Sequence, residues 1–278
     1  MIVPTHDRPA PLLNCLRALE RQATASSIEV LVVDDGSTND QHVARIVGQH
    51  PVARLIRQAQ HGPAAARNAG VRAARGRFIC FTDDDCQPAA DWVERLTASL
   101  YADADATAGA TINGLPYDAR AEASQTIVEF LSTVDASGQL RFAPTSNLAC
   151  KREVADAVPF DERYPAAAGE DRDWCARVRA AGYRLKAEPD AVVEHCPDLT
   201  LRRFWRQHVA YGRGACTFRR AHGERPLERP AFYAKLLKVG FRKGWATGLL
   251  VCLAQIATAA GYGLELAKLA DRPGSGRR

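Results

Sequence analysis

Apolar residues along the first hundred positions follow two different spacings. Residues 10–22 place leucines at helical intervals, whereas residues 29–33 read EVLVV with no polar residue between the apolar ones. A helix covered on one side gives the first pattern, and a strand covered on both faces gives the second. Their alternation predicts an α/β fold, with helices that cross over a mostly parallel sheet.

The same two patterns, less clearly developed, predict further elements along the chain. After residue 40 we expect a helix from Asp40, a weak strand at 54–57, an alanine-rich helix at 63–75, a strand at 77–82 and a helix at 88–100. The middle of the chain predicts a strand at 107–113, an amphipathic stretch at 126–134 and a strand at 146–150. Later elements are a helix that begins at Glu170 and stops at Gly182, a strand at 191–195 and an arginine-rich helix at 201–220.

Two of the expected strands end in carboxylates. Asp34 and Asp35 follow EVLVV, and Asp83, Asp84 and Asp85 follow RFICFT. The carboxyl ends of parallel strands meet at one rim, where open α/β sheets bind ligands. Three adjacent carboxylates repel one another unless a cation lies among them, and Mg²⁺ or Mn²⁺ commonly bridges carboxylates to substrate phosphates. By itself, the triplet fits a solvated acidic turn that caps the next helix better than it fits a metal site.

Other candidates have two interpretations each. His195 ends the expected strand AVVEH and is either a satisfied strand-end side chain or a metal ligand. Glu170 and Asp171 begin a helix, where carboxylates stabilise free N–H groups, but one of them can also act as a general base. Arg67 begins the alanine-rich helix and is either exposed or placed to bind a diphosphate.

The C-terminal part has a different composition. Residues 244–264 form a stretch of about 21 residues without a charge, long enough for a bilayer span but diluted by Gln255 and several glycines. The segment therefore either spans a membrane or lies on it. Arginines and aromatic residues alternate along 201–220, which fits a solvated helix face, a cap over a phosphate-bearing ligand or a basic surface on anionic lipid.

Composition narrows the class of protein. The 278 residues are 46% hydrophobic and 25% charged, which excludes wholesale disorder, collagen-like repeats and a transporter with many spans. A net charge of +5 is too small to indicate nucleic acid as a partner. Eight cysteines without a CxxC pair indicate neither a disulfide framework nor structural zinc. The opening MIVPTHDRP lacks a secretory pattern, so we expect a cytoplasmic protein. The uncharged C-terminal stretch adds the expectation that it lies at the inner face of the cell membrane.

Taken in order, six segments resemble the family 2 glycosyltransferases of the GT-A fold, over roughly residues 1–215. They are IVPTHDRP, EVLVVDDGSTND, HGPAAARNAGVRAARGRFICFTDDDCQP, TSNLACKR with PFDERY, GEDRDWCARVRAAGYRL and VVEH. The resemblance implies a GT-A domain at 1–215, whose Rossmann-like sheet is flanked by helices, and a helical, membrane-associated extension at 216–278.

The resemblance also implies roles for individual positions. Asp171 matches the catalytic base, with Glu170 as the alternative if the register shifts by one. Asp83 and Asp85 match the acids that hold a divalent metal, Mg²⁺ or Mn²⁺, and His195 is an additional ligand. The positions that match the donor site, for a nucleoside-diphosphate sugar, are Pro4, Thr5, Asp34, Asp35, Arg67, Asp83, Asp84 and Asn147.

The implied reaction is an inverting sugar transfer to a hydroxyl of a glycan, a lipid-linked compound or another acceptor, as in cell-envelope polysaccharide synthesis. The chain lacks the QxxRW signature of the family's longer polymerases and has RQHVAYGRG at 206–214. We therefore expect transfer of one or a few sugars.

Two rival functions remain at this stage. One is a metal-dependent phosphohydrolase, although Gln87 stands where such enzymes carry Thr or Val. The other is a membrane-docked protein that binds a sugar or a lipid carrier without catalysis.

Overall fold

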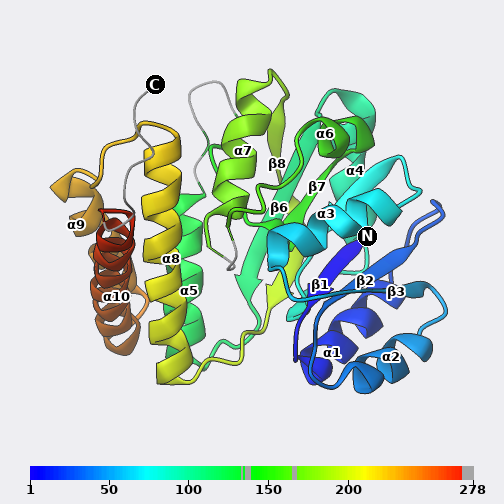
Figure 1. Cartoon of the computed structure of the whole chain (residues 1–278), viewed down its shortest axis with the longest axis horizontal. Coiled ribbons are helices and arrows are strands. Elements are labelled where there is room, and N and C mark those ends of the chain that lie inside the picture. Colours follow the sequence, from blue (N-terminus) through cyan, green and yellow to red (C-terminus); the bar gives the residue numbers. More distant parts are fainter. Residues whose placement is uncertain (133, 135–138, 165–167, 271–278) are drawn as a thin grey trace.

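An eight-stranded sheet organises the molecule in the computed structural model, which describes residues 1–132, 134, 139–164 and 168–270 (Figure 1). The strand order is β3-β2-β1-β4-β7-β6-β8-β5. The parallel half contains β1 (Ile2–Thr5), β2 (Val30–Asp35), β3 (Ala53–Gln58) and β4 (Phe78–Phe81). The other half contains β5 (Cys86–Pro88), β6 (Ala106–Asn113), β7 (Leu148–Lys151) and β8 (Leu185–His195). The expected α/β class is confirmed.

The parallel half brings the two acidic clusters to one rim. Thr5 pairs with Asp34 across β1 and β2, and Ile2 pairs with Phe81 across β1 and β4. The carboxyl ends of β1, β2 and β4 therefore meet at the same rim. The structure confirms the predicted position of both clusters.

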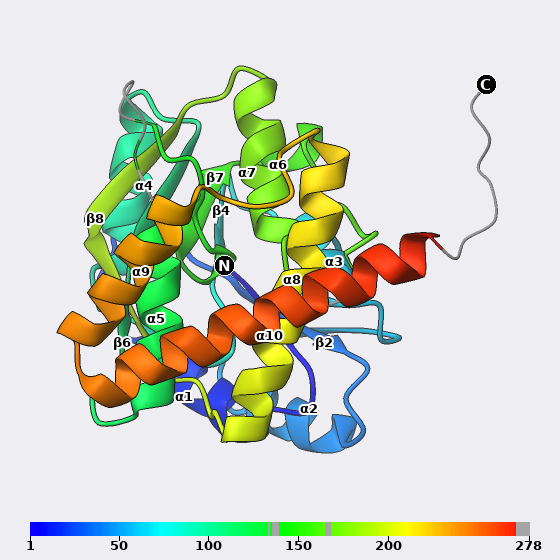
Figure 2. The same cartoon turned by 90° about the vertical axis from the view of Figure 1, so that its left-hand side faces the viewer.

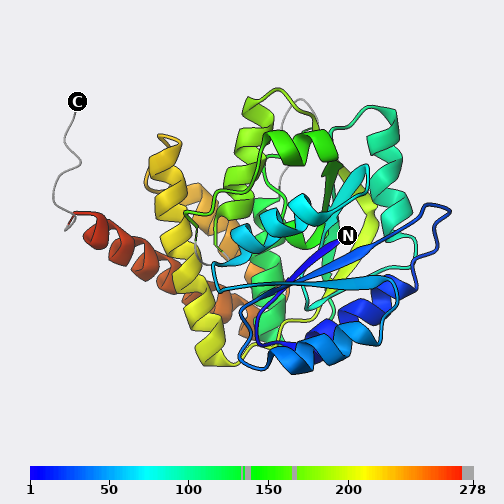
Figure 3. The ribbon, with the colours of Figure 1, turned by 45° about the vertical axis from the view of Figure 1, so that its right-hand side comes forward.

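Helices cover both faces of this half, which explains the unbroken apolar runs. Leu31 and Val33 pack with α3 (Pro63–Ala73) on one face. Val30 and Val32 pack on the other face with α1 (Pro9–Glu20), α2 (Asp40–Gly48) and α4 (Trp92–Ala102). Figure 3 shows α3 in front of β1 and β2 and the two N-terminal helices below them. Burial on both faces removes any need for polar alternation.

Several element boundaries differ from the prediction. α5 (Ala119–Leu131) begins well before the expected stretch at 126–134, because the Asp118 side chain accepts the Arg120 and Ala121 N–H groups and starts the helix there. Residue 133 of that stretch lies outside the described residues. The strand expected at 146–150 begins as a short 3₁₀ turn, η1 (Thr145–Asn147), before β7. β8 starts earlier than expected, because it pairs with β6 along two segments separated by a register shift.

Helices form a layer at one side of the sheet. It contains α5, α8 (Leu201–Ala221), α9 (Pro230–Arg242) and α10 (Trp245–Ala270), and they share a separate apolar core around Phe204, Leu236 and Val251. Figure 2 shows α10 lying across the outer side of α8. The expected domain boundary at 215 falls inside the unbroken helix α8. The short α6 (Arg152–Ala157) was not predicted from the sequence, and α9 lies in the extension at 216–278 that was expected to be helical, without bounds of its own.

Candidate active site

The acid triplet occupies the turn that follows β4, and its middle member is buried. Asp84 is 2% exposed. Its carboxylate accepts a hydrogen bond of 2.7 Å from Thr5 Oγ1 and pairs at 2.9 Å with Nη1 of Arg8. Burial raises the pKa of Asp84 to about 7, although Arg8 opposes the shift. The interpretation of the triplet as a solvated turn is therefore wrong.

Asp85 lies between two cationic groups. The pairing of β5 with β8 sets Cys86 opposite His195, and this places Nε2 of His195 3.3 Å from Oδ2 of Asp85. The same oxygen is 2.5 Å from Nη2 of Arg8. Burial alone would raise the pKa of Asp85, but His195 and then Arg8 outweigh it and lower that pKa. Asp85 in turn raises the pKa of His195 against its burial.

The same corner of the site has ligand atoms for a divalent ion. A carboxylate oxygen of Asp85, Sγ of Cys86 and a ring nitrogen of His195 all lie within 4.8 Å of one another. Burial raises the pKa of the Cys86 thiol well above its usual range. Mg²⁺ and Mn²⁺ prefer oxygen ligands to thiols, so Cys86 is the least suitable of the three. The carboxylate and the imidazole match the ligands that Mn²⁺ and Mg²⁺ accept. Asp83, the third predicted ligand, is not in this group.

Arg8 was not predicted to be a site residue, yet it contacts two of the three acids. It follows Asp7, whose φ of 53° lies in the left-handed region. Asp tolerates this region because its side chain bonds locally, and here the Asp7 carboxylate accepts from the backbone N–H and hydroxyl of Thr38 at 2.7 and 2.8 Å. The resulting turn directs Arg8 toward the acids. In the sequence it lies within IVPTHDRP, but nothing in that segment indicates a contact with acids about 77 residues away.

Arg67 joins the strand-end acids to the start of α7 (Glu170–Ala180). It is 3% exposed at the beginning of α3. Its Nη2 lies 2.9 Å from Oδ1 of Asp83, and its Nη1 lies 3.0 Å from Oε1 of Glu170. Three segments separated by up to 103 residues therefore meet at one guanidinium. The interpretation of Arg67 as an exposed residue on a helix is wrong.

The two acids at the start of α7 have different surroundings. Glu170 is buried against Arg67, while one of its oxygens, Oε2, has no hydrogen-bond partner among the described residues. Asp171 is half-buried, and one of its oxygens accepts the Arg172 N–H at 2.7 Å. Burial, followed by the charge of Glu170, raises the pKa of Asp171 to about 7. A carboxylate with a pKa near neutrality suits a general base.

Helix α8 packs directly behind this helix start. Gly169 has a φ of 92°, and a Cβ there would lie 3.1 Å from the Gly214 carbonyl oxygen of α8. A Cβ on Gly214 would lie 2.1 Å from the Ala168 carbonyl oxygen. Tyr211 lies one turn earlier on α8 and was not among the predicted site residues. Its burial, together with the charges of Asp171 and Glu170, raises the pKa of its hydroxyl. Glycines at 169 and 214 thus let α7 and α8 approach closely beside the acids.

Asp34 and Asp35 hold the neighbouring loops. Oδ1 of Asp35 accepts from Gln58 Nε2 at 2.7 Å and from the His61 N–H at 2.9 Å, and its Oδ2 accepts from the Gly62 N–H at 2.8 Å. Asp34 Oδ1 accepts from the Ser37 N–H at 3.0 Å. These bonds fix the segment that leads into α3, and therefore the position of Arg67.

The side chain of Asn147, an expected donor-site residue, is directed into the fold. It is fully buried, its Oδ1 accepts from Trp92 Nε1 at 2.8 Å, and its Nδ2 donates to the carbonyl oxygens of Ala110 and Ala191 at 3.0 and 2.8 Å. The amide uses both of its hydrogens within the fold, so donating a hydrogen bond to a sugar would cost one of these bonds. Pro4 lies within β1, one residue before Thr5.

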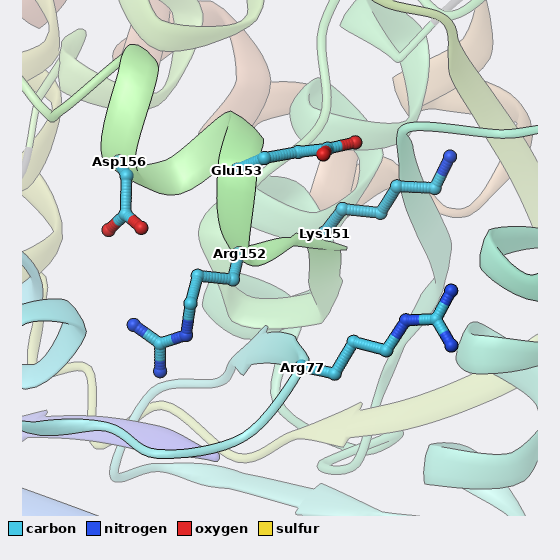
Figure 4. Close-up of a pocket in the computed structure, with 5 residues that line it drawn as sticks. All are labelled: Arg77, Lys151, Arg152, Glu153 and Asp156. Carbon is cyan, nitrogen blue, oxygen red and sulfur yellow. The ribbon is translucent and has the colours of Figure 1, made fainter.

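A basic pocket lies away from these acids, at the other end of β4. It has a volume of about 410 Å³ and is lined by Arg77, Lys151, Arg152, Glu153 and Asp156. Figure 4 shows that Arg77 and Lys151 point away from Arg152 and Asp156. The side chains do not converge on one point, so the pocket does not contribute to the site around Asp83.

The fold and part of the sequence match known proteins. A family model described as "Glycosyl transferase family 2" matches residues 1–158. A pre-mycofactocin glycosyltransferase of Mycobacterium tuberculosis is 30% identical over 225 residues, which are 77% of this chain and 47% of that protein. The chain thus spans about half the length of this relative.

Solved structures share the architecture at lower identity. A mannosyltransferase from Pyrobaculum calidifontis, in complex with GDP-Man and Mn²⁺, has a TM-score of 0.63 at 21% identity and covers 97% of this chain and 77% of its own. Glucosyl-3-phosphoglycerate synthase of Mycobacterium tuberculosis, in complex with Mn²⁺, UDP-Glc and phosphoglyceric acid, has a TM-score of 0.58 at 16% identity. It covers 81% of this chain and 79% of its own. These similarities show that the fold is shared.

Proposed function

Because the chain belongs to glycosyl transferase family 2, we propose that it transfers a sugar from a nucleoside-diphosphate sugar to an acceptor hydroxyl with inversion at the anomeric carbon. The fold neighbours that were solved with GDP-Man or UDP-Glc and Mn²⁺ support this class of donor and a divalent ion. The family membership also favours transfer over the rival phosphohydrolase and over binding without catalysis.

One observation carries the proposal: Arg67 binds Asp83 at 2.9 Å and Glu170 at 3.0 Å. Asp83 belongs to the strand end that would hold the donor, and Glu170 is adjacent to the acid that would activate the acceptor. A single buried guanidinium therefore keeps the two halves of the reaction within reach of each other. Had these acids faced separate surfaces, transfer between two bound substrates would have had no structural basis.

We assign the role of general base to Asp171 and not to Glu170. Oε1 of Glu170 pairs with Arg67 and its Oε2 is buried, so this carboxylate is less accessible to an acceptor than the half-buried Asp171. Asp171 has an oxygen that no described side chain binds and a pKa of about 7. It would take the proton of the acceptor hydroxyl as that oxygen attacks the anomeric carbon, while the bond to the nucleoside diphosphate breaks on the opposite face.

We assign the divalent ion to Asp85 and His195, with Asp83 at the open side of the triplet. When bound, such an ion neutralises charge on the departing diphosphate. Arg8 now lies against Asp84 and Asp85, where it supplies positive charge to the same carboxylates. It therefore has to share the acids with the ion or move toward the phosphates.

For the donor we propose the pocket edge formed by Pro4, Thr5, Asp34 and Asp35, with Arg67 and Asp84 behind it. The side chain of Asp35 shapes the 58–62 segment, the side chain of Asp34 holds the turn at Ser37, and the backbone beside them would meet the nucleotide. Asn147 supports the sheet below. The acceptor would be a glycan or a lipid-linked compound in cell-envelope polysaccharide synthesis at the inner face of the membrane, because α10 is long and apolar enough to contact a bilayer.

A panel of nucleotide sugars tests the proposal. Purified protein is incubated with each UDP- or GDP-sugar and a mixture of acceptors, with Mn²⁺ or with EDTA, and released nucleoside diphosphate is measured. We expect release with at least one donor, at a rate that falls with EDTA, and a product heavier by one sugar. Hydrolysis of p-nitrophenyl phosphate without sugar transfer would favour the phosphohydrolase, and binding of a donor without turnover would favour the non-catalytic alternative.

A further inference from the structure

Helix α10 has two apolar faces, and only one of them is covered. Thr247, Val251, Ala254 and Ala257 are buried against the helical layer. On the opposite side, Trp245, Leu249, Ile256 and Leu264 are 53% to 80% exposed. Their spacings of four, seven and eight residues place these four side chains in one stripe along the helix. We call this stripe the outer stripe of α10.

The inner side of α10 packs so closely on α8 that the two helix backbones are in contact. A Cβ on Gly212 would lie 2.0 Å from the Thr258 carbonyl oxygen, and a Cβ on Gly261 would lie 2.0 Å from the Val209 carbonyl oxygen. Gly248 makes a similarly close approach to Phe241 of α9. A helix that spans a bilayer alone would expose its whole circumference to lipid. α10 cannot do so without separating from α8 and α9.

Arginines flank the outer stripe on α8. Arg202, Arg206, Arg213 and Arg220 lie four, seven and seven residues apart, which places them on one face. This face adjoins the one that carries Val209 and Gly212 and contacts α10. All four are exposed, and none has an ion pair with any residue that the structure describes. By contrast, the neighbouring Arg203 pairs with Asp198, and Arg219 pairs with Glu228.

We propose that the outer stripe of α10 and these four arginines form a docking face that lies flat on an anionic lipid bilayer. The apolar stripe would enter the boundary between headgroups and acyl chains, and the arginines beside it would bind lipid phosphates. Because the four arginines beside the outer stripe have no ion pairs within the described chain, we expect this face to bind an anionic membrane more tightly than a neutral one. This deepens the membrane contact proposed above, and it is independent of sugar transfer because binding is measured without a donor.

Vesicle binding tests the docking face on the full chain. The protein is sedimented with phosphatidylcholine vesicles that contain or lack about a third of phosphatidylglycerol. We expect clear binding only with the anionic lipid and a marked decrease in high salt. The triple variant R206E/R213E/R220E should bind at least about 100-fold more weakly, since each basic residue near the surface contributes roughly a fivefold factor.

A matched control separates position from net charge. Lys235 and Lys238 are exposed on α9, on the side turned away from its contact with α10. Arg242, the last residue of α9, is also exposed. K235E/K238E/R242E makes the same change of net charge and should weaken binding much less than the α8 variant. L249D/I256D should abolish binding while the fold, followed by circular dichroism, is kept, because both side chains are exposed.

Three results would overturn the proposal. Equal binding to neutral and anionic vesicles would remove the role of the arginines. Retention of the bound protein after alkaline carbonate extraction would indicate a spanning helix. A dimer in sedimentation velocity without lipid that L249D/I256D converts to a monomer would show that a second copy covers the stripe. None of these results depends on whether the chain transfers a sugar.

Discussion

Charged side chains are organised in opposite ways at the two sides of the molecule. At the rim of the sheet, Arg8 and Arg67 are bound to acids from distant segments, and the acids there are mostly buried. On α8, Arg206 and Arg213 are exposed and have no ion pair within the described chain. Buried, mutually paired charges fit a small charged ligand whose position must be fixed. Exposed, unpaired arginines fit a large charged surface, such as a lipid bilayer, that binds without one fixed position.

We expect the largest loss of activity from a substitution at Asp171, in the buried charged site. Asp171→Asn removes the proposed base but keeps the size and most contacts of the side chain. Turnover should fall by about 10²- to 10⁴-fold with little change in donor affinity, as measured by nucleoside diphosphate release and by calorimetry. Asp173→Asn is the control, since Asp173 binds Arg177 and His222 and should affect stability more than turnover. A nearly unchanged rate in Asp171→Asn would remove it from the role.

The pH profile sharpens the same prediction. A base must be deprotonated to act, and the pKa of Asp171 is about 7. The value of kcat/KM should therefore rise about tenfold per pH unit below pH 7 and level off above it. In Asp171→Asn this rise should disappear from the residual activity.

Arg67→Met tests whether the rim depends on internal pairing. Glu170 would be left buried without its partner, so the free energy of unfolding should fall by about 3–5 kcal/mol in urea titrations. Arg45→Met, at an exposed position on α2, should change it little. The double variant Arg67→Met/Glu170→Gln should recover part of the loss. If the single variant lost less than about 1 kcal/mol, the pair would not be important for stability.

Gly261→Val tests the helical layer, where close packing of α10 on α8, and not ion pairing, holds the elements together. The new side chain would collide with the Val209 carbonyl of α8. Overpacking of this kind costs about 1–3 kcal/mol, and we expect a lower Tm in a thermal scan. Gly263→Val is a close control, because it lies in the same helix and a Cβ there has nothing within 4 Å. Equal losses in both variants would point to helix propensity and not to the contact with α8.

Arg8→Ala should have the smallest effect. Unlike the other variants it should improve a property, the affinity for Mn²⁺. Arg8 now competes for the carboxylates of Asp84 and Asp85. Its removal should tighten the Kd for Mn²⁺ without donor by roughly fivefold, the equivalent of about 1 kcal/mol in calorimetry. Arg45→Ala should leave the Kd unchanged. Weaker Mn²⁺ binding in Arg8→Ala would show that the guanidinium helps to form the site.

Local patterns predicted most of the fold, and they failed where distant contacts decide. β2 and α3 were predicted from their sequences because burial and helix spacing act on adjacent residues. The three-residue β5 exists only because β8 is beside it, and such pairing leaves no local pattern. The acids at 83–85 and 170–171 stand out as clusters. Arg8 does not, because its role comes from the left-handed turn at Asp7 and from partners 77 residues away.

The separation of these partners along the chain has a consequence for biosynthesis. Arg67 leaves the ribosome long before Glu170, which follows 103 positions later. Until that point, the nascent segment holds a strongly charged cluster whose neutralising contacts are incomplete. The sheet edge beside β4 must also wait for β7, because β7 is made after residue 147. We therefore expect the rim to acquire its final form only after most of the polypeptide has been translated.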